Sequence, residues 1–265
     1  MKLIGRNHVV IDRSLADTMR AFKKCGYDGL ELSIARATTN LVSWDYLEDS
    51  MIAVIKDLSE QLELPVCSMS CHMGFTTDDN VFEADKKMIQ QVRKYGTDIV
   101  IISTPADEKR RELAPEGIYG QMTKRLKELC TIAEYNGVTI ALETEPNQLL
   151  HNMDLFYEYA EKINSPALKM NMDIGHLYLS EADMYEALKK AGPWIAHSHI
   201  DNMCRGEHCH KLPWAGDIDL LKAYQMMKDL GFDGAVGLDL YIQDYLSVSE
   251  ECVSYIKNNI FAKLK

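Results

Sequence analysis

Short apolar runs and longer amphipathic stretches alternate along the whole chain. Eight of the runs are mainly apolar, with few polar residues inside them. Strands that are buried on both faces of a sheet have this pattern, whereas a strand with one solvated face alternates between apolar and polar residues. The predicted strands are residues 3–10, 29–33, 66–70, 98–103, 138–143, 168–173, 195–199 and 235–239.

A helix-like stretch follows each predicted strand. Ser14 is a suitable N-cap for the first helix, because its hydroxyl can accept from a free backbone N–H. Gly26, Gly96, Gly137 and Gly231 stand where helices end and a left-handed residue is favoured. The predicted helices are residues 14–25, 46–62, 79–95, 118–135, 153–163, 181–191, 218–230 and 246–263.

Eight strands that each precede a helix predict a (β/α)8 TIM barrel. The length of 265 residues and the hydrophobic fraction of 46% suit one such barrel, so we expect a single domain over residues 1–265. A doubly wound open sheet is the alternative architecture. It would normally have a glycine-rich first turn for a nucleotide, and the sequence shows none.

Four of the predicted strands end in side chains that bind metals. These side chains are Glu143, Asp173, His199 and Asp239. Parallel α/β proteins hold their chemistry at the carboxyl ends of the strands, so four strands around one axis would bring these groups together. Three carboxylates and one imidazole favour one divalent ion, Mn²⁺, Mg²⁺ or Co²⁺, with Zn²⁺ as an alternative.

Charge and cysteine content indicate which partners and which cellular compartment to expect for the protein. The net charge of −11 argues against a nucleic-acid partner, because such proteins usually present a basic face. The sequence has no secretory signature and no apolar run of membrane-spanning length. Seven cysteines, an odd number, fit a reducing compartment. We therefore expect a cytoplasmic protein with no membrane or nucleic-acid partner, and a homo-oligomer is compatible with the sequence.

Five motifs follow one another along the chain: GYDGLEL at 26–32, ALE at 141–143, MDIGH at 172–176, HSHIDN at 197–202 and HKLPWAGDID at 210–219. In their order and spacing they resemble the sugar isomerase/epimerase barrels, the sugar phosphate isomerase/epimerase family of the xylose isomerase-like TIM barrel superfamily. This superfamily also includes inosose-metabolising enzymes and metal-dependent apurinic endonucleases. The resemblance extends over nearly the whole chain.

The resemblance implies that Glu143, Asp173, His199 and Asp239 are the metal ligands. Asp239 departs from the family pattern, which usually has the longer glutamate there. The implied activity is that of a metal-dependent sugar or cyclitol isomerase or epimerase. It would work by proton transfer through a metal-stabilised enediolate, with Glu143 and Asp239 as the acid/base pair. No glycine-rich phosphate cradle follows the last two strands, which favours an unphosphorylated sugar or polyol.

Five further residues are predicted to bind the substrate, partly from the same resemblance. They are Glu31, His72, His176, Arg205 and His210. Glu145 is an alternative to Glu143 as a ligand, but Pro146 indicates that the strand has ended. His197 shares a strand face with His199, and we interpret it as a neighbour of the site inside the barrel.

Other functions remain open at this point. A dehydratase or lyase acting on a sugar-derived carbonyl compound would use the same proton abstraction. A zinc-dependent phosphodiesterase of the apurinic endonuclease type is favoured by His208 and His210, which align with an acid-x-histidine zinc pair of that branch. Ser103, in place of a histidine of that branch, and the charge of −11 count against it. A non-catalytic barrel has only the shortened Asp239 in its favour.

Overall fold

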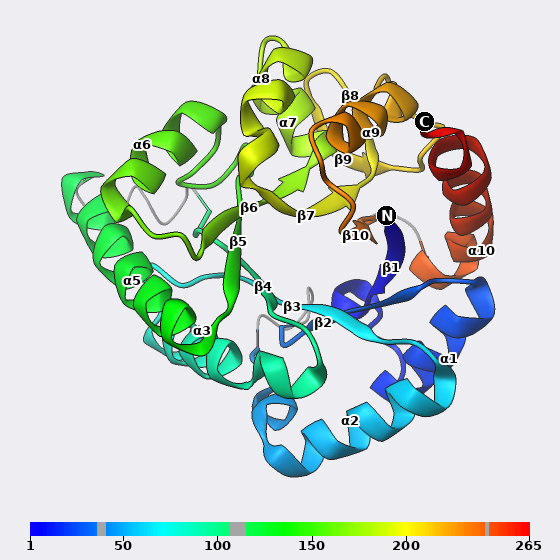
Figure 1. Ribbon diagram of the computed structural model, residues 1–265, viewed down its shortest axis with the longest axis horizontal. Coiled ribbons are helices and arrows are strands. Elements are labelled where there is room, and N and C mark those ends of the chain that lie inside the picture. Colours follow the sequence, from blue (N-terminus) through cyan, green and yellow to red (C-terminus); the bar gives the residue numbers. More distant parts are fainter. Residues whose placement is uncertain (36–40, 107–114, 242–243) are drawn as a thin grey trace.

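The computed structural model describes residues 1–35, 41–106, 115–241 and 244–265, and within them eight parallel strands form a closed barrel (Figure 1). Around the barrel the strands follow the order β1-β10-β7-β6-β5-β4-β3-β2. This arrangement confirms the predicted TIM barrel. The barrel strands are β1 Lys2–Arg6, β2 Gly29–Ser33, β3 Val66–Gly74, β4 Ile99–Ser103, β5 Thr139–Glu143, β6 Leu168–Asp173, β7 Ile195–Ile200 and β10 Ala235–Leu238.

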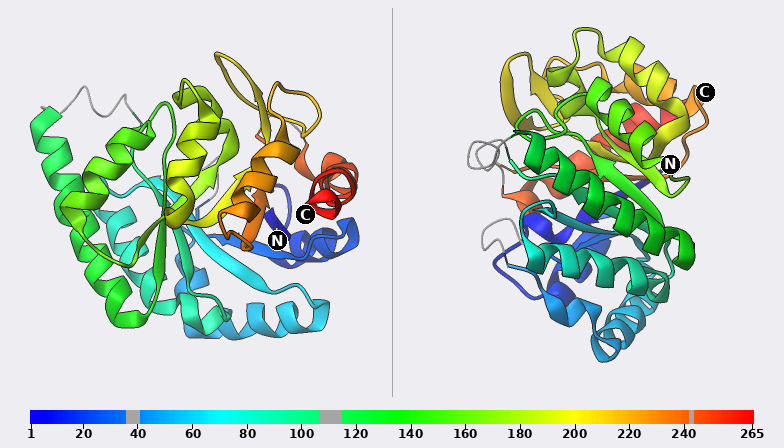
Figure 2. Two further views of the ribbon diagram at one scale, coloured as in Figure 1. Left: turned by 45° about the horizontal axis from the view of Figure 1, so that its top comes forward. Right: turned by 90° about the vertical axis from the view of Figure 1, so that its left-hand side faces the viewer.

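Helices surround the barrel as an outer ring (Figures 1 and 2). They are α1 Leu15–Cys25, α2 Asp49–Leu62, α3 Asp79–Gln91, α5 Pro115–Asn136, α6 Met153–Ile163, α7 Ile174–Ser180, α8 Met184–Ala191, α9 Leu220–Asp229 and α10 Tyr245–Tyr255. Short helical turns extend or link these elements. They are η1 Asn7–Val9, η2 Trp44–Leu47, η3 Val92–Tyr95, η4 Gly192–Trp194, η5 Ile256–Ile260 and η6 Phe261–Lys263.

The predicted helix ends are confirmed. The Ser14 hydroxyl accepts from the Asp17 backbone N–H at 3.1 Å and caps α1. Gly26 closes the same helix with a φ of +87°, a left-handed conformation that costs glycine little. Apolar side chains of the strands and helices form one core between the sheet and the helix ring. No helix in the part of the chain that the structure describes is long and apolar enough to cross a membrane.

Two elements near the barrel mouth depart from the predicted pattern. Helix α7 starts directly after β6, where we had predicted a helix only from residue 181. The connection after β7 forms an antiparallel hairpin of β8 Asn202–Cys204 and β9 Glu207–Lys211, which stands out from the barrel in Figure 2. Both elements cover the carboxyl ends of β6 and β7, so they shape the site described next.

The first strand is shorter than predicted. It ends at Arg6 and continues as the turn η1, although the apolar pattern extends to residue 10. The Asn7 side chain diverts the backbone, because its Nδ2 donates to the Ser33 carbonyl at 3.1 Å and its Oδ1 accepts from the Ser33 N–H. As a result, Arg6 stands at a strand end, where barrel proteins place functional side chains.

Candidate active site

The structure brings the four predicted metal ligands together at the mouth of the barrel. Glu143 ends β5, Asp173 ends β6, His199 lies in β7 and Asp239 directly follows β10. One ligand atom from each residue lies within 4.8 Å of the corresponding atoms of the others, and all four residues are buried. The parallel pairing of these strands brings their carboxyl ends to the same mouth, with Glu143 opposite Asn171, Asp173 opposite His199 and His199 opposite Gly237.

His199 directs one ring nitrogen at the three carboxylates. Its Nδ1 lies 3.4 Å from Glu143 Oε1, 3.8 Å from Asp173 Oδ2 and 3.7 Å from Asp239 Oδ2. Its Nε2 lies 2.9 Å from Glu31 Oε2 on the opposite side of the ring. A histidine that donates its second N–H to a carboxylate keeps the first nitrogen available as a ligand.

The ionisable side chains of this group strongly influence one another's pKa values. Burial and Arg6 oppose protonation of His199, but Glu31 and Glu143 outweigh them and raise its pKa to about 10. Burial raises the pKa of Asp173 to about 7 against the opposing charge of His176. A metal would remove the proton from His199 and stabilise the carboxylates.

The donor set fits a divalent ion. Oxygen and imidazole ligands bind such ions at roughly 2.0–2.2 Å, so opposite ligand atoms lie about 4 Å apart in a filled site. The four ligand atoms all lie within 4.8 Å of one another, which is compatible with this value. In addition, Asp173 Oδ2 is buried and has no hydrogen-bond partner among the residues that the structure describes. Glu143, Asp173, His199 and Asp239 could therefore hold one ion.

Arg6 belongs to this site, although the sequence analysis did not single it out. Its side chain is 1% exposed. Its Nε donates to Glu31 Oε1 at 3.0 Å, one terminal nitrogen pairs with Asp239, and the other lies 2.7 Å from His72 Nε2. In the sequence, Arg6 is a charged residue inside an apolar run. The strand predicted over residues 3–10 continues through this position and gives it no role.

Glu31 lies inside the barrel, where it contacts His199, and it is not among the residues that line the cavity described below. It is fully buried, and both of its oxygens are occupied by His199, Arg6 and His72. In this arrangement both Glu31 oxygens contact protein side chains, and its role in substrate binding stays a prediction. Glu31 lies in the middle of β2, not at its end, so its side chain remains inside the barrel.

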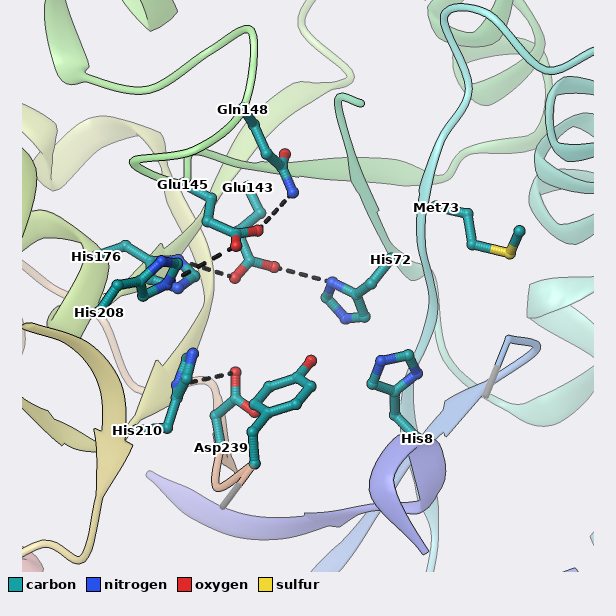
Figure 3. Close-up of a pocket in the computed structure, with 11 residues that line it drawn as sticks. His8, His72, Met73, Glu143, Glu145, Gln148, His176, His208, His210 and Asp239 are labelled. Carbon is teal, nitrogen blue, oxygen red and sulfur yellow. Dashed lines mark hydrogen bonds and ion pairs between the residues drawn. The ribbon is translucent and has the colours of Figure 1, made fainter. Parts of the chain in front are cut away.

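A cavity of about 340 Å³ opens beside the candidate ligands (Figure 3). Its size suits a small metabolite. Three of the predicted substrate residues, His72, His176 and His210, line it. The complete lining is His8, His72, Met73, Glu143, Glu145, Gln148, His176, His208, His210, Asp239 and Tyr241. His8 and Tyr241 each stand two residues beyond a charged residue, Arg6 at the end of β1 and Asp239 directly after β10, and the strand predicted over residues 3–10 concealed the first of these positions.

The structure does not bring Arg205 to this cavity. The Arg205 guanidinium lies over the ring of Tyr178, 4.0 Å from its centroid, and donates to the Glu181 carbonyl at 3.1 Å. Because Arg205 is at the turn of the hairpin, it points to the outer end of α7. The substrate contact of Arg205 therefore stays a prediction, and the side chain lies outside the lining of this cavity.

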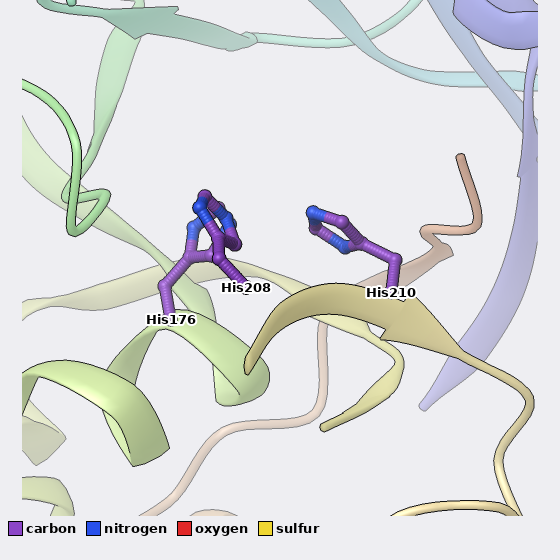
Figure 4. Close-up of side chains that lie close together, drawn as sticks. All are labelled: His176, His208 and His210. Atoms are coloured by element: carbon purple, nitrogen blue, oxygen red, sulfur yellow. The ribbon is translucent and has the colours of Figure 1, made fainter. Parts of the chain in front are cut away.

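A second cluster of metal-binding side chains borders the first. His176 of α7 and His208 and His210 of β9 each offer a ring nitrogen, and these nitrogens lie within 4.8 Å of one another (Figure 4). His208 Nδ1 lies 2.8 Å from Asn147 Nδ2, and His210 Nδ1 lies 2.9 Å from Asp201 Oδ2. Burial and His176 lower the pKa of His208 to about 4, so its ring is neutral and can act as a ligand.

Comparison with known proteins places the chain in a family. Residues 19–252 match the family model described as "Xylose isomerase-like TIM barrel". This match covers most of the chain, and the protein therefore belongs to the xylose isomerase-like TIM barrel family. The suspected resemblance is confirmed at this level.

Proteins that are similar to this chain have different activities. The chain is 24% identical over 199 residues to 3-dehydroshikimate dehydratase of Bacillus anthracis, covering 74% of this chain and 69% of that protein. It is 22% identical over 233 residues to L-ribulose-5-phosphate 3-epimerase UlaE of Salmonella paratyphi A, covering 85% and 81%. A crystal structure of IOLI protein with a zinc atom has the same fold, with a TM-score of 0.80 at 22% identity and coverage of 100% and 99%.

Proposed function

We propose that this protein is a metal-dependent isomerase or epimerase of a sugar or cyclitol. The observation that carries the proposal is the convergence of Glu143, Asp173, His199 and Asp239 beside a cavity of about 340 Å³. Epimerase relatives support the same class of reaction. The reaction is proton transfer at a carbon next to a carbonyl.

The four ligands would hold one divalent ion, which when bound polarises a carbonyl and stabilises the negative charge that develops on it. Glu143 and Asp239 come from different sides of the barrel, and both line the cavity. We assign them as the base that removes the proton and the acid that returns it. His72 Nδ1 lies 3.1 Å from Glu143 Oε2 and orients this carboxylate toward the substrate.

The lining of the cavity supports a hydroxyl-rich substrate. Histidine, glutamate, glutamine and tyrosine side chains surround the space, and each can exchange hydrogen bonds with hydroxyl groups. None of the described lining residues is a lysine or arginine. We therefore propose an unphosphorylated sugar, ketose or polyol as the substrate.

The first experiment joins metal content with hydrogen exchange. Protein purified without chelator would be analysed for bound metals and then incubated in D₂O with a panel of free ketoses. About one Mn²⁺, Co²⁺ or Mg²⁺ per chain, with deuterium at one carbon, is the expected result. Protein that binds divalent ions but exchanges no substrate proton would contradict the proposal. Loss of water from the labelled substrate would instead identify a dehydratase, the activity of the Bacillus anthracis relative.

The cluster of His176, His208 and His210 favours a second candidate, a zinc-dependent phosphodiesterase. Together with the four-ligand site, it would give two or more zinc ions close to one cavity, an arrangement that activates water for attack on phosphodiesters. This candidate predicts two or three zinc ions per chain and cleavage of bis(p-nitrophenyl) phosphate. His208→Ala should then lose one of these ions, whereas one ion per chain without phosphodiester cleavage would dismiss it.

A further inference from the structure

Arg6 is a fully buried cation between two parts of the candidate metal site. We infer that Arg6 is a positioning residue, which holds Asp239 and, through Glu31, His199 in the orientation that metal binding requires. The inference rests on the proposed metal site and extends it to a residue outside the ligand set. It depends on three structural features, which concern Asp239, His199 and the space around the guanidinium.

First, Arg6 contacts only one of the two carboxylate oxygens of Asp239. One terminal nitrogen of Arg6 pairs with Oδ1 of Asp239. The other oxygen, Oδ2, turns toward the ligand group, 3.7 Å from His199 Nδ1. Asp239 therefore has one oxygen free for a metal, and its side chain cannot rotate to offer both without breaking the ion pair.

Second, Arg6 fixes the ring of His199 indirectly. Arg6 Nε donates to Glu31 Oε1 at 3.0 Å, and Glu31 Oε2 lies 2.9 Å from His199 Nε2. A planar guanidinium that donates from a fixed position limits the rotation of the carboxylate. Glu31 in turn holds the imidazole, with Nδ1 directed at the other ligands.

Third, the barrel provides a defined place for the guanidinium. A Cβ at Gly237 of β10 would lie 3.2 Å from Arg6 Cδ, 3.1 Å from Glu31 Oε2 and 3.0 Å from His199. The absence of a side chain at this position thus leaves room for the whole group. The Tyr245 hydroxyl accepts from the Arg6 backbone N–H at 3.2 Å and donates to the Leu238 carbonyl at 3.0 Å, which ties β1 to β10.

The test is a double-mutant cycle on metal affinity, which needs no substrate. Chelator-treated wild type, Arg6→Met, Asp239→Asn and the double variant would be titrated with Co²⁺ by calorimetry, and the Co²⁺ absorption spectrum recorded. We expect Arg6→Met to weaken binding about 10–100-fold and to change the spectrum, because partners of ligands commonly have effects of this size. In the Asp239→Asn background the same change should cost clearly less than in wild type, because only the route through Glu31 and His199 remains.

Further variants separate positioning from folding. Arg6→Lys keeps the charge but loses the planar fork, so it should bind Co²⁺ more weakly than wild type while unfolding at a similar temperature. The double variant removes both charges and should fold even where Arg6→Met does not. Arg125→Met is the matched control, because Arg125 donates to the Phe75 and Asp78 carbonyls outside the site. Its Co²⁺ affinity should equal that of wild type.

Two outcomes would overturn the inference. If Arg6→Lys has the Co²⁺ affinity and spectrum of wild type, then only the positive charge of Arg6 matters, as a partner for the buried Glu31, and its geometry does not. Losses that simply add in the double variant would mean that Arg6 and Asp239 act independently. If the wild type binds no divalent ion, the proposed function fails as well. If it binds Co²⁺ but catalyses no exchange, only the proposed function fails.

Discussion

At the scale of single residues, position in the barrel decides what a histidine can do. His197 and His199 lie two residues apart on β7 and share one face. His199 faces charged carboxylates, which raise its pKa to about 10. His197 lies between the neutral Ser68 hydroxyl at 3.1 Å and the Asn171 side-chain oxygen at 2.8 Å, and burial lowers its pKa to about 3. One ring is therefore suited to a charged site, and the other is a neutral part of the barrel interior.

Replacement of Glu143 by glutamine tests the proposed base. Glutamine preserves the shape of the side chain but cannot accept the proton, so we expect substrate exchange to fall about 10²–10⁴-fold. Solvent deuterium incorporation measures this rate. Glu145→Gln is the matched control. The Glu145 side chain also lines the cavity but is not part of the four-ligand group, and the variant should retain Co²⁺ binding. Undiminished exchange in Glu143→Gln would remove this residue from the mechanism.

His197 predicts a specific pH dependence of stability. Its folded-state pKa of about 3 lies below the ordinary value of 6.5, so between these values the unfolded chain binds a proton that the folded chain does not. The contribution of His197 to stability is therefore complete above about pH 6.5 and falls as the pH falls, by about 2 kcal/mol at pH 5. Urea unfolding of metal-free wild type and His197→Gln at pH 7 and pH 5 separates this contribution from those of the other ionisable groups. His197→Gln should lose about 2 kcal/mol less than wild type, and equal losses would contradict this assignment.

At the scale of elements, the helix and hairpin above β6 and β7 complete the site. Helix α7 begins at the candidate ligand Asp173, whose Oδ1 accepts from the His176 backbone N–H at 2.8 Å and caps the helix. Its second residue, Gly175, packs so closely that a Cβ there would lie 2.4 Å from Asp201 Oδ1. Strand β9 then brings His210 next to this helix. The second histidine cluster thus depends on contact between two elements that are distant in sequence.

Two glycines in helices predict opposite effects of substitution by alanine. Gly175→Ala forces atoms together at the contact between α7 and the Asp201 side chain, and we expect a loss of about 1–3 kcal/mol in stability. Gly120→Ala in α5 meets nothing within 4 Å and should raise stability by about 0.5–1 kcal/mol. Thermal and urea unfolding of the two variants provide the measurement. A stable Gly175→Ala variant would show that α7 can shift without cost.

At the scale of the whole molecule, the barrel gathers buried negative charge at one end. Glu31, Glu143, Asp173, Asp201 and Asp239 are all buried close to the axis. A divalent ion would balance part of this charge only in the folded chain, because the ligands come from four separate strands. Binding of an ion at the proposed site would therefore be coupled to folding.

This coupling predicts a large effect of metal on thermal stability. Mn²⁺ or Co²⁺ at 100 times its dissociation constant should stabilise the fold by about 2.7 kcal/mol. For a chain of this size, that corresponds to a rise of about 5–10 °C in Tm relative to chelator-treated protein. Calorimetric scans measure this difference. Asp173→Asn, which lacks one buried ligand charge, should show little or no rise in Tm. A wild-type Tm that does not change with any divalent ion would contradict the proposed site.

The sequence by itself determined the barrel and the four candidate ligands. Strands that are buried on both faces read as apolar runs, and in a parallel barrel their carboxyl ends meet at one mouth. Therefore Glu143, Asp173, His199 and Asp239 had to lie close together once the eight strands were recognised.

Only the tertiary structure decided which other side chains join them. Arg6 enters the site because the Asn7 side chain ends β1 there and Gly237 on the neighbouring strand leaves space. Glu31 is held below the site, and Arg205 is turned away by the hairpin, although both resembled substrate contacts in the sequence. The physical reason is that the direction of a side chain depends on the residues packed around it. Those residues come from neighbouring strands and connections, whose register and shape no local pattern contains.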